Sequence, residues 1–472
     1  MNLSEAIATW ANRRGDAIAL TGVKDITYKE LDNYARSYAQ QIMEVLPYYS
    51  QKIAILAHDN ISFIFFLLSI IRSGNAFVLI NPMLSTNQIN KSLDEIKCEY
   101  YISNSPRSDI HAKYIPIDLH TTFVDNDSET IYPNIGITAD AGVIFSSGTT
   151  GEPKALMRSS YSILSETIQW IIELQLHIGT SFLIPRPLYY TGGFILMYAS
   201  LFSGGRVDLL DDLSYISVLE YVQNVSVDWA FIVPSVIREI NATNSYSHMA
   251  KNVLTMGSPI FHSDKIAFYN KFKCNLIEVW GNSEGLGTIT EPSDLFEHPF
   301  SIGKPFFTDY LNVTNNEGQL FGISDNEFSE YIGQPELTQM VLHEGYIYSE
   351  DLGYKDENGY FYLTGRMRDI IVVDGVKVFP SDIERELLST KKIYDCAVFS
   401  TRDDNGNDIV SAALVMKEDH IPYQLICSIN SNLAPHERIR RYILLNAIPR
   451  NHGGKIDKKV LVVPSIEIYE VE

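Results

Sequence analysis

The first third of the chain alternates short apolar runs with longer amphipathic stretches. The apolar runs at 17–20, 53–56, 76–79, 99–102 and 142–145 are typical of buried β-strands. The run ISFIFFLLSIIR, residues 61–72, predicts a buried helix, because it is too short to span a bilayer and ends at an arginine. Helices between buried strands predict parallel βαβ units, and therefore an α/β fold with mixed sheets.

The pattern changes after about Gly318 to short strands and turns. Residues 357–359, Glu-Asn-Gly between aromatic runs, predict a β-hairpin. The stretch FPSDIERELL then predicts a helix with Ser381 as its N-cap and Glu384 three residues later as the capping partner. A small α+β unit follows. We expect a large N-terminal unit, residues 1–367, and a small unit, residues 368–472.

Composition and charge indicate a globular protein whose main partner is not nucleic acid. The chain has 472 residues, of which 45% are hydrophobic, enough for two or three globular domains. A net charge of −21 argues against nucleic acid as a partner. Cysteines 98, 274, 396 and 427 lie far apart without a CxxC pair, and the N-terminus lacks a secretory signal. We expect a cytoplasmic protein without a membrane span.

The stretch FSSGTTGEPKAL, residues 145–156, has the composition of a loop that binds phosphate. Gly148 and Gly151 allow backbone N–H groups to approach an anion, and Lys154 adds a positive charge. Only two residues separate the glycines, whereas the Walker loop requires four. Taken alone, the stretch is compatible with a plain turn or with a phosphate site.

Five further segments follow in a fixed order, and together with SSGTTGEPK they resemble the adenylate-forming superfamily. This superfamily comprises acyl- and aryl-CoA ligases, adenylation domains of nonribosomal peptide synthetases, and luciferases. The segments are PLYYTGGF (187–194), VWGNSEG (279–285), SEDLGYKDENGYFYLTGRMRDII (349–371), GVKVFPSDIE (375–384) and PRNHGGKIDKKVL (449–461). Residues 187–194 lack the aspartate with which amino-acid-activating domains pair a substrate ammonium, so the chain is most similar to the acyl- and aryl-acid branch.

The resemblance implies that ATP and a carboxylic acid form an acyl-adenylate and pyrophosphate, with Mg²⁺ as the metal. Asp351 would accept hydrogen bonds from the ribose, Glu284 would hold Mg²⁺ beside Ser283, and Lys455 would bridge the acid and the α-phosphate. The implied ATP and AMP contacts are Ser146, Ser147, Gly148, Thr149, Thr150, Gly151, Lys154, Ser258, Trp280, Gly281, Asn282, Asp351 and Arg366.

It also implies a pocket for the acid and a path for a thiol. The candidate pocket residues are Tyr189, Tyr190, Gly192, Gly193, Phe194, Met197, Ser235, Met256, Gly257 and Leu286. Their aromatic character suits an aryl or medium-chain acyl group. The small unit would be mobile and rotate about a hinge at Arg368, and Gly375, Val376 and Lys377 would line the route of a phosphopantetheine thiol.

Four positions depart from the family pattern. Tyr190 replaces a frequent histidine, Arg368 an aspartate or lysine, Gln319 a glutamate, and Glu350 a glycine. The resemblance favours transfer of the acyl group to coenzyme A. It leaves open transfer to an acidic carrier protein, direct amide formation, and a silent relative that only binds nucleotide; the presence of Lys455 opposes the last. Residues 437–459 contain seven basic and two acidic side chains. They could contact the phosphates of coenzyme A or an acidic carrier protein, or they could form a solvated face.

Overall fold

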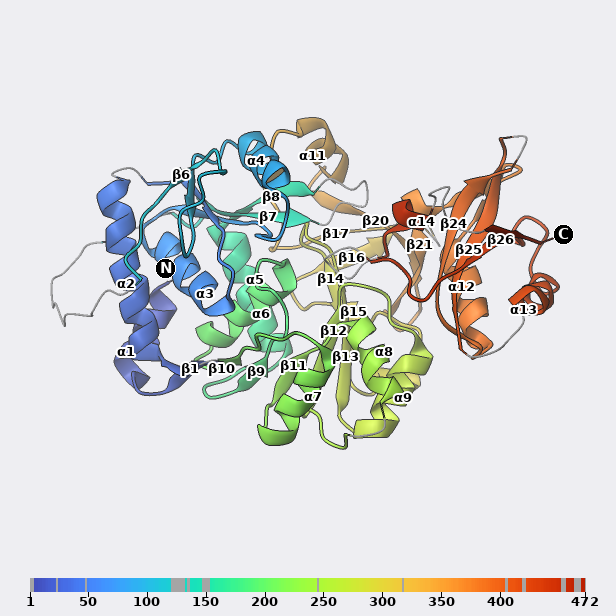
Figure 1. Ribbon diagram of the computed structural model, residues 1–472, viewed down its shortest axis with the longest axis horizontal. Helices are drawn as coiled ribbons and strands as arrows, with labels where there is room; N and C mark the ends of the chain where they lie inside the picture. The colour runs from blue at the N-terminus through green and yellow to red at the C-terminus, as the bar shows by residue number, and fades with distance from the viewer. Residues whose placement is uncertain are drawn as a thin grey trace.

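The computed structural model of the protein describes most of the chain. The described residues are 4–22, 24–46, 49–119, 132–133, 136–146, 153–243, 246–315, 318–403, 406–417, 422–450, 456–461 and 468–471. Their helices and strands form the mixed α/β fold that the sequence predicts, which is therefore confirmed (Figure 1).

Two large sheets organise residues 1–309, and the short strand β18 from later in the chain joins the second sheet. The first has the strand order β15-β14-β13-β12-β11-β9-β10-β1-β2. Its strands are β1 (Ile18–Thr21), β2 (Ile26–Thr27), β9 (Ser181–Leu183), β10 (Arg206–Asp208), β11 (Trp229–Phe231), β12 (Asn252–Met256), β13 (Asn275–Gly281), β14 (Gly287–Ile289) and β15 (Lys304–Pro305). The second has the order β18-β8-β7-β4-β3-β5-β6. Its strands are β3 (Lys52–Ile55), β4 (Ala76–Leu79), β5 (Tyr100–Ile102), β6 (Lys113–Tyr114), β7 (Asp140–Ser146), β8 (Lys154–Ser159) and β18 (Glu330–Tyr331). The apolar runs of the sequence thus became buried strands within one or two residues of their predicted bounds.

Helices cover and separate these sheets. They are α1 (Glu5–Arg14), α2 (Tyr28–Val45), α3 (Asn60–Arg72), α4 (Thr86–Glu95), α5 (Ser160–Glu173), α6 (Thr191–Phe202), α7 (Tyr215–Asn224), α8 (Pro234–Ala242), α9 (His262–Phe272), α10 (Asp294–Glu297) and α11 (Pro335–Val341). The largest apolar core contains residues of α3, α5, α6 and both sheets. In α3 every residue from Phe63 to Arg72 is buried, as its uniformly apolar sequence predicts. Arg72 is tolerated there because its guanidinium pairs with Asp32 at 2.6 Å.

A third sheet lies between the large sheets and the C-terminal part of the chain (Figure 1). It comprises β16 (Tyr310–Val313), β17 (Gly318–Ile323), β19 (Leu342–His343), β20 (Tyr346–Lys355) and β21 (Phe361–Arg366). The predicted Glu-Asn-Gly hairpin is confirmed, since it joins β20 to β21 with Lys355 opposite Phe361. The 3₁₀ turn η1 (Met367–Asp369) ends this region.

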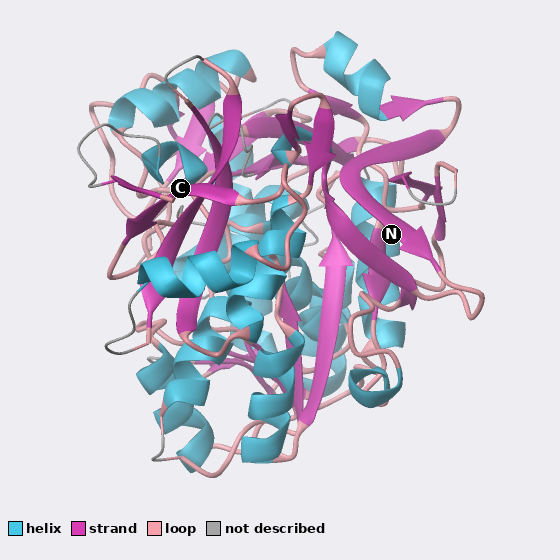
Figure 2. Cartoon of the chain, turned by 90° about the vertical axis from the view of Figure 1, so that its right-hand side faces the viewer, coloured by secondary structure: helices cyan, strands magenta, loops and turns pink. Residues whose placement is uncertain are grey.

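The remaining elements form a separate four-stranded sheet and a hairpin, seen from their own side in Figure 2. They are β22 (Ile371–Val373), β23 (Val376–Val378), α12 (Pro380–Ser389), β24 (Ile393–Arg402), β25 (Asp408–Met416), α13 (Pro422–Asn430), β26 (Ile439–Leu444), α14 (Lys458–Leu461) and β27 (Ile468–Glu470). They have an apolar core of their own. The division at residues 367 and 368 stays a prediction. No helix in the described part of the chain is long and apolar enough to cross a membrane.

The predicted capping box at α12 is wrong. Phe379 occupies the N-cap position without a side-chain cap, and Pro380 begins the helix, where its missing N–H costs nothing. The Ser381 hydroxyl instead donates to the Thr364 carbonyl of β21 at 2.6 Å, and the Glu384 carboxylate accepts from the Val398 N–H at 2.8 Å. Both side chains therefore form long-range contacts that local sequence does not reveal.

Two carboxylates and two arginines meet where β24 approaches the large unit. Arg238 of α8 lies 2.9 Å from Asp395 of β24 and 3.3 Å from Asp264 of α9. Arg450 also reaches Asp395, at 2.7 Å. We call Arg238 and Asp395 the inter-unit bridge, because one belongs to residues 1–367 and the other to residues 368–472.

Replacing Glu384 by glutamine should stabilise the protein at pH 8 but not at pH 5. Burial raises the pKa of Glu384 from 4.5 to about 7, against the opposing effects of Lys458 and the Val398 N–H. The folded protein therefore holds a proton that the unfolded chain has lost, so the free energy of unfolding decreases as pH rises from about 4.5 to about 7. Melting temperatures of both proteins at the two pH values measure this effect. An equal difference between the proteins at both pH values would contradict it.

Candidate active site

The predicted site residues gather at one edge of the first sheet. Strands β9, β11, β12 and β13 are parallel neighbours, so their carboxyl ends lie at the same edge. Tyr189, Tyr190 and Gly192 follow β9; the remaining candidates at this edge are Ser235 after β11, Gly257 and Ser258 after β12, and Asn282, Ser283 and Glu284 after β13. Ligands of open α/β sheets bind outside this edge. The strand order thus places segments nearly a hundred residues apart around one surface.

Asp351 is a buried carboxylate with two donors from different strands. It lies on β20, where it is 5% exposed. Its Oδ2 accepts a hydrogen bond from the Trp280 indole Nε1–H at 3.0 Å, and its Oδ1 accepts from Arg366 Nε at 2.6 Å. Two donors on one carboxylate fix the side chain in one orientation. The carboxylate therefore joins the first sheet to the third before any ligand arrives.

Glu284 belongs to a second polar group that includes Tyr331 and Lys154, the first residue of β8. The Tyr331 hydroxyl donates to the Glu284 carboxylate, and the Lys154 ammonium lies over the Tyr331 ring, 5.4 Å from its centroid. Ser146 and Lys154 are opposite each other in the antiparallel pair β7–β8. The ends of β7 and β8 therefore pair at the position where Lys154 approaches Tyr331.

Cations surround this glutamate. Burial lowers the pKa of Lys154, the Arg368 charge lowers it further, and Glu284 opposes both. Burial likewise lowers the pKa of Arg368, against the influence of Asp369 and Glu284. The two cations Lys154 and Arg368 thus lie near Glu284, and such charges are suited to hold a polyanion.

All four departures from the family pattern have identifiable contacts. Arg368 forms an ion pair with Glu350, so the unusual charge beside Asp351 has an equally unusual partner. Gln319 donates from Nε2 to the Ser349 carbonyl at 2.7 Å, a bond that a glutamate could not donate. Tyr190 lies beside Tyr189, with ring centroids 4.7 Å apart.

The turn that carries Glu284 is held by backbone packing. The Asn282 side chain accepts from the N–H groups of Gly285 and Leu286, at 3.0 and 2.9 Å. Gly285 has φ +127°, and a Cβ there would lie 2.6 Å from the Asn326 carbonyl oxygen. The Phe328 N–H donates to the Glu284 carbonyl at 3.0 Å. The Asn282 oxygen is therefore engaged in the turn itself.

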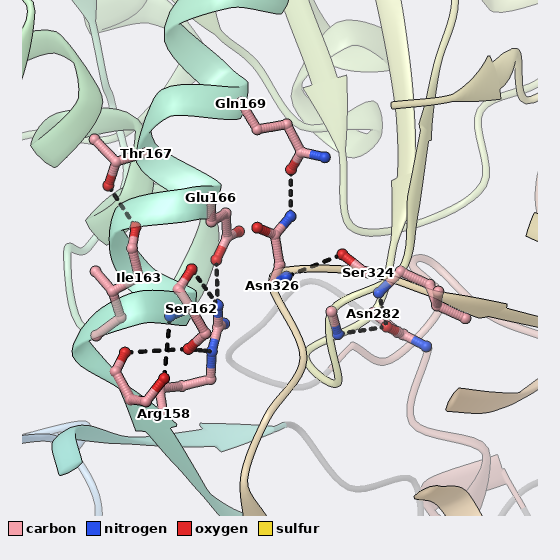
Figure 3. A network of polar contacts seen from close by, with 12 residues as sticks. Arg158, Ser162, Ile163, Glu166, Thr167, Gln169, Asn282, Ser324 and Asn326 are labelled. Carbon is pink, nitrogen blue, oxygen red and sulfur yellow. Dashed lines mark hydrogen bonds and ion pairs between the residues drawn. The ribbon is translucent and has the colours of Figure 1, made fainter. Parts of the chain in front are cut away.

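A polar network connects this turn with α5 (Figure 3). The Asn326 amide donates to the Gln169 side chain, whose own amide donates to Thr308 at 2.6 Å. The Ser324 hydroxyl and the Gly287 N–H donate to Asp309, at 2.7 and 3.1 Å. Burial raises the pKa of Asp309 to about 6, against these donors. The same helix begins beside Arg158, which is 2% exposed and bonds Ser162 and Glu166 (Figure 3).

The residues predicted to bind the acid fall into two groups. Gly192 borders Met256 and Phe231, because a Cβ on Gly192 would lie 3.4 Å from an atom of each. Gly257 has no atom within 4 Å of its would-be Cβ and is exposed. Ser235 and Ser258 are half-buried. These residues form an open surface at the carboxyl edge of the sheet.

The second group lies in the apolar cores behind that surface. Phe194 and Met197 are fully buried on α6, and the Phe194 ring packs on Phe77 of the other sheet at 5.2 Å. Leu286 and the Trp280 ring belong to a core cluster with residues of the third sheet. The Gly193 backbone approaches the Pro187 carbonyl. Direct contact of these side chains with a ligand stays a prediction. Their packing supports the residues of the open surface at the carboxyl edge of the sheet.

Several predicted site residues lie outside the described residues. These are Ser147, Gly148, Thr149, Thr150, Gly151 and Lys455. The predicted thiol-path residues Gly375, Val376 and Lys377 are exposed, at the turn and in β23 of the two-stranded hairpin. Gly281 is also exposed and ends β13, whereas Ser283 is half-buried in the following turn.

Sequence reasoning missed Tyr331, Asn326 and Arg186. The first two follow no motif, and only the fold brings them to Glu284. Arg186 could have been noticed, because it is a charged residue three positions after the end of the apolar strand β9. Its guanidinium lies over the rings of Tyr190 and Phe231, at 5.3 and 5.7 Å.

Comparison with known proteins agrees with this geometry. Residues 7–327 match the family model described as AMP-binding enzyme. The chain is 24% identical to a 2-succinylbenzoate–CoA ligase of Oceanobacillus iheyensis, over 96% of this chain and 98% of that one. It is 22% identical to the long-chain-fatty-acid–CoA ligase FadD13 of Mycobacterium tuberculosis, over 92% of each. The fold is similar to that of the O-succinylbenzoate coenzyme A synthetase MenE of Bacillus subtilis in complex with AMP, with a TM-score of 0.86 at 20% identity, covering 97% of both chains.

Replacing Asp351 by asparagine should lower the free energy of unfolding by about 1–3 kcal/mol, because an amide cannot accept from both Trp280 and Arg366 without turning its NH₂ towards a donor. In a Trp280→Phe background the same substitution should lower the free energy of unfolding by less, because the indole donor is already absent. Urea denaturation of the four proteins completes this double-mutant cycle. Additive costs would show that the indole and the carboxylate are not coupled.

Proposed function

Because the chain belongs to the family of AMP-binding enzymes, we propose that it activates a carboxylic acid with ATP and transfers the acyl group to coenzyme A. In the first half-reaction the acid attacks the α-phosphorus of ATP, an acyl-adenylate forms and pyrophosphate leaves. In the second, the thiol of coenzyme A attacks the acyl carbon and AMP leaves. The protein is thus an AMP-forming acid–thiol ligase.

The observation that carries this proposal is the arrangement of Asp351, Glu284 and Lys154 around one edge. Asp351 is oriented by Trp280 and Arg366 and offers lone pairs that two ribose hydroxyls can use. Lys154, at the end of the glycine-rich loop, lies near Glu284, where cations can stabilise a leaving pyrophosphate. A ribose site and a pyrophosphate site at the same edge suit a nucleotide triphosphate cleaved at its α-phosphorus.

The residues present fit a Mg²⁺ ion that is shared with phosphates. No group of three or more histidine, cysteine or acidic side chains that could hold a metal occurs among the described residues. Mg²⁺ bound to nucleotides typically takes one or two protein carboxylates and fills its other positions with phosphates and water. Glu284 would supply that carboxylate, held by the Tyr331 hydroxyl. When bound, the ion neutralises phosphate charge.

The names of the relatives favour coenzyme A as the acceptor. Both curated relatives are named as CoA ligases, but for different acids, so these names do not define the acid used by this chain. The exposed hairpin residues 375–377 would guide the thiol. The basic stretch 437–459 would meet the phosphates of coenzyme A, or the acidic surface of a carrier protein in the alternative reading.

Two arrangements of the small unit would serve the two half-reactions. In one, Lys455 reaches the acid and the α-phosphate; in the other, rotation near Arg368 brings residues 375–377 to the adenylate. The inter-unit bridge of Arg238 and Asp395 would stabilise the described arrangement against the other. Two further groups limit its strength, because Asp395 also binds Arg450 and Arg238 also binds Asp264.

A panel of carboxylic acids in an ATP–pyrophosphate exchange assay tests the first half-reaction. We expect exchange that requires both Mg²⁺ and an acid. The exchange rate of the Lys455→Ala variant should be at least 100-fold lower than that of the wild type. Its rate of thioester formation from supplied acyl-adenylate and coenzyme A should stay within about threefold of the wild-type rate. Loss of the lysine removes only the charge that acts during adenylation.

The Lys392→Ala variant is the matched control, because Lys392 is an exposed lysine of the same unit. Its exchange should equal that of the wild type. Absence of exchange with every acid would exclude adenylation. Exchange without a CoA thioester, together with acylation of a carrier protein, would favour the carrier alternative.

The Arg238→Gln variant should change the two half-reactions in opposite directions. The substitution weakens the inter-unit bridge and so shifts the population between the two arrangements. Adenylation is measured by exchange, and thioester formation from supplied acyl-adenylate. We expect the ratio of the two rates to change by at least threefold. Equal changes in both rates would indicate that the bridge does not distinguish the arrangements.

A further inference from the structure

Arg186 differs from the other partly buried arginines of the site. Arg366 binds Asp351, Arg368 binds Glu350 and Arg238 binds two aspartates. Within the described ranges, no carboxylate forms an ion pair with Arg186; its contacts are the faces of Tyr190 and Phe231. A half-buried cation without an anion loses part of its hydration and gains only ring contacts in return.

The surroundings of Arg186 keep its charge uncompensated. Burial lowers the pKa of Arg186, which nevertheless remains protonated at neutral pH because arginine starts above 12. Burial raises the pKa of Tyr190, so this phenol stays neutral and supplies a ring face rather than a countercharge. The guanidinium edge, where its N–H donors lie, is the part that two stacked rings leave available.

Its position assigns Arg186 to the acid side of the site. It follows β9, and Phe231, one of its two ring contacts, ends β11. Phe231 also borders Gly192 and Met256, which are candidates for the acid pocket. The nucleotide side, by contrast, is built around Asp351 and Lys154, from other sheets. Arg186 therefore serves the part of the acid that enters the pocket.

We propose that the Arg186 guanidinium binds a second carboxylate of the substrate, so that the enzyme activates one end of a dicarboxylic acid. This inference rests on the proposed function. A carboxylate matches the planar fork of the guanidinium and can accept two parallel hydrogen bonds. Tyr190 and Phe231 orient the fork. Tyrosine at position 190 then has a purpose, since its neutral ring stacks on the guanidinium where a protonated histidine would repel it.

Matched pairs of acids test this proposal in the exchange assay. Each pair differs by one distal carboxylate: hexanoic and hexanedioic acid, octanoic and octanedioic acid, and 4-phenylbutanoic acid with its ring-carboxylated analogues. We expect the wild type to have the higher kcat/KM for the dicarboxylic member of at least one pair. In Arg186→Met, the ratio of kcat/KM within that pair should decrease by about 10- to 100-fold, mainly through KM, as expected for a lost charged hydrogen bond.

Two further variants separate binding from structure. Arg186→Lys keeps the charge but not the planar fork, so its ratio of kcat/KM within the pair should lie between those of the wild type and Arg186→Met. This variant also tests the proposal if Arg186→Met does not fold. Arg402→Met is the matched control, because the Arg402 side chain is 78% exposed on β24. Its ratio should equal that of the wild type.

The possible failures are distinguishable. Exchange with monocarboxylic acids and no preference for any dicarboxylic acid would overturn this inference alone. A proportional loss of kcat/KM for both members of a pair in Arg186→Met would also overturn it. That result would indicate that Arg186 has a structural role or contacts the reacting carboxylate. Exchange with none of the acids, including the monocarboxylic members, would overturn the proposed function and this inference together.

Discussion

The arrangement of the site depends on a carboxylate that is buried where two sheets meet. Removing Asp351 from water carries a large desolvation cost, which only well-placed donors can offset. The donors come from different elements, Trp280 on β13 of the first sheet and Arg366 on β21 of the third. Satisfying one side chain therefore fixes the relative position of three strands. The proposed ribose site and the start of the predicted hinge region are consequently held by the same contacts.

The alternation of β20 extends this constraint to the hinge region. Along residues 346–353 of β20, half-buried and buried positions alternate, so Asp351 faces the interior and its neighbour Glu350 faces the other side. Glu350 there meets Arg368, which lies two residues after Arg366. The two departures from the family pattern thus form one ion pair that links β20 to the predicted hinge. A glycine at position 350 would leave Arg368 without this partner.

Local patterns in the sequence predicted local structure well. The buried strands, the apolar helix α3 and the hairpin after Lys355 follow from periodicity and turn chemistry, because their causes lie within a few residues. The capping box at Ser381 failed for the opposite reason, since a carbonyl on β21 accepts its hydroxyl. Tyr331 likewise reaches Glu284 only through the pairing of β18 with β8. The motifs therefore predict candidate site residues, but they do not reveal the contacts that hold those side chains.

The two sides of the site differ in how their charges are balanced. On the nucleotide side, Asp351 and Glu284 receive hydrogen bonds from the protein itself, so their geometry exists before substrates bind. On the acid side, aromatic rings hold Arg186 in place but leave its charge unmatched. Fixed carboxylates suit a nucleotide, whose ribose and phosphates are the same in every reaction of this kind. An unmatched cation is favourable only when a ligand brings the missing anion, so in the proposed acid pocket Arg186 would select substrates that carry a second negative charge.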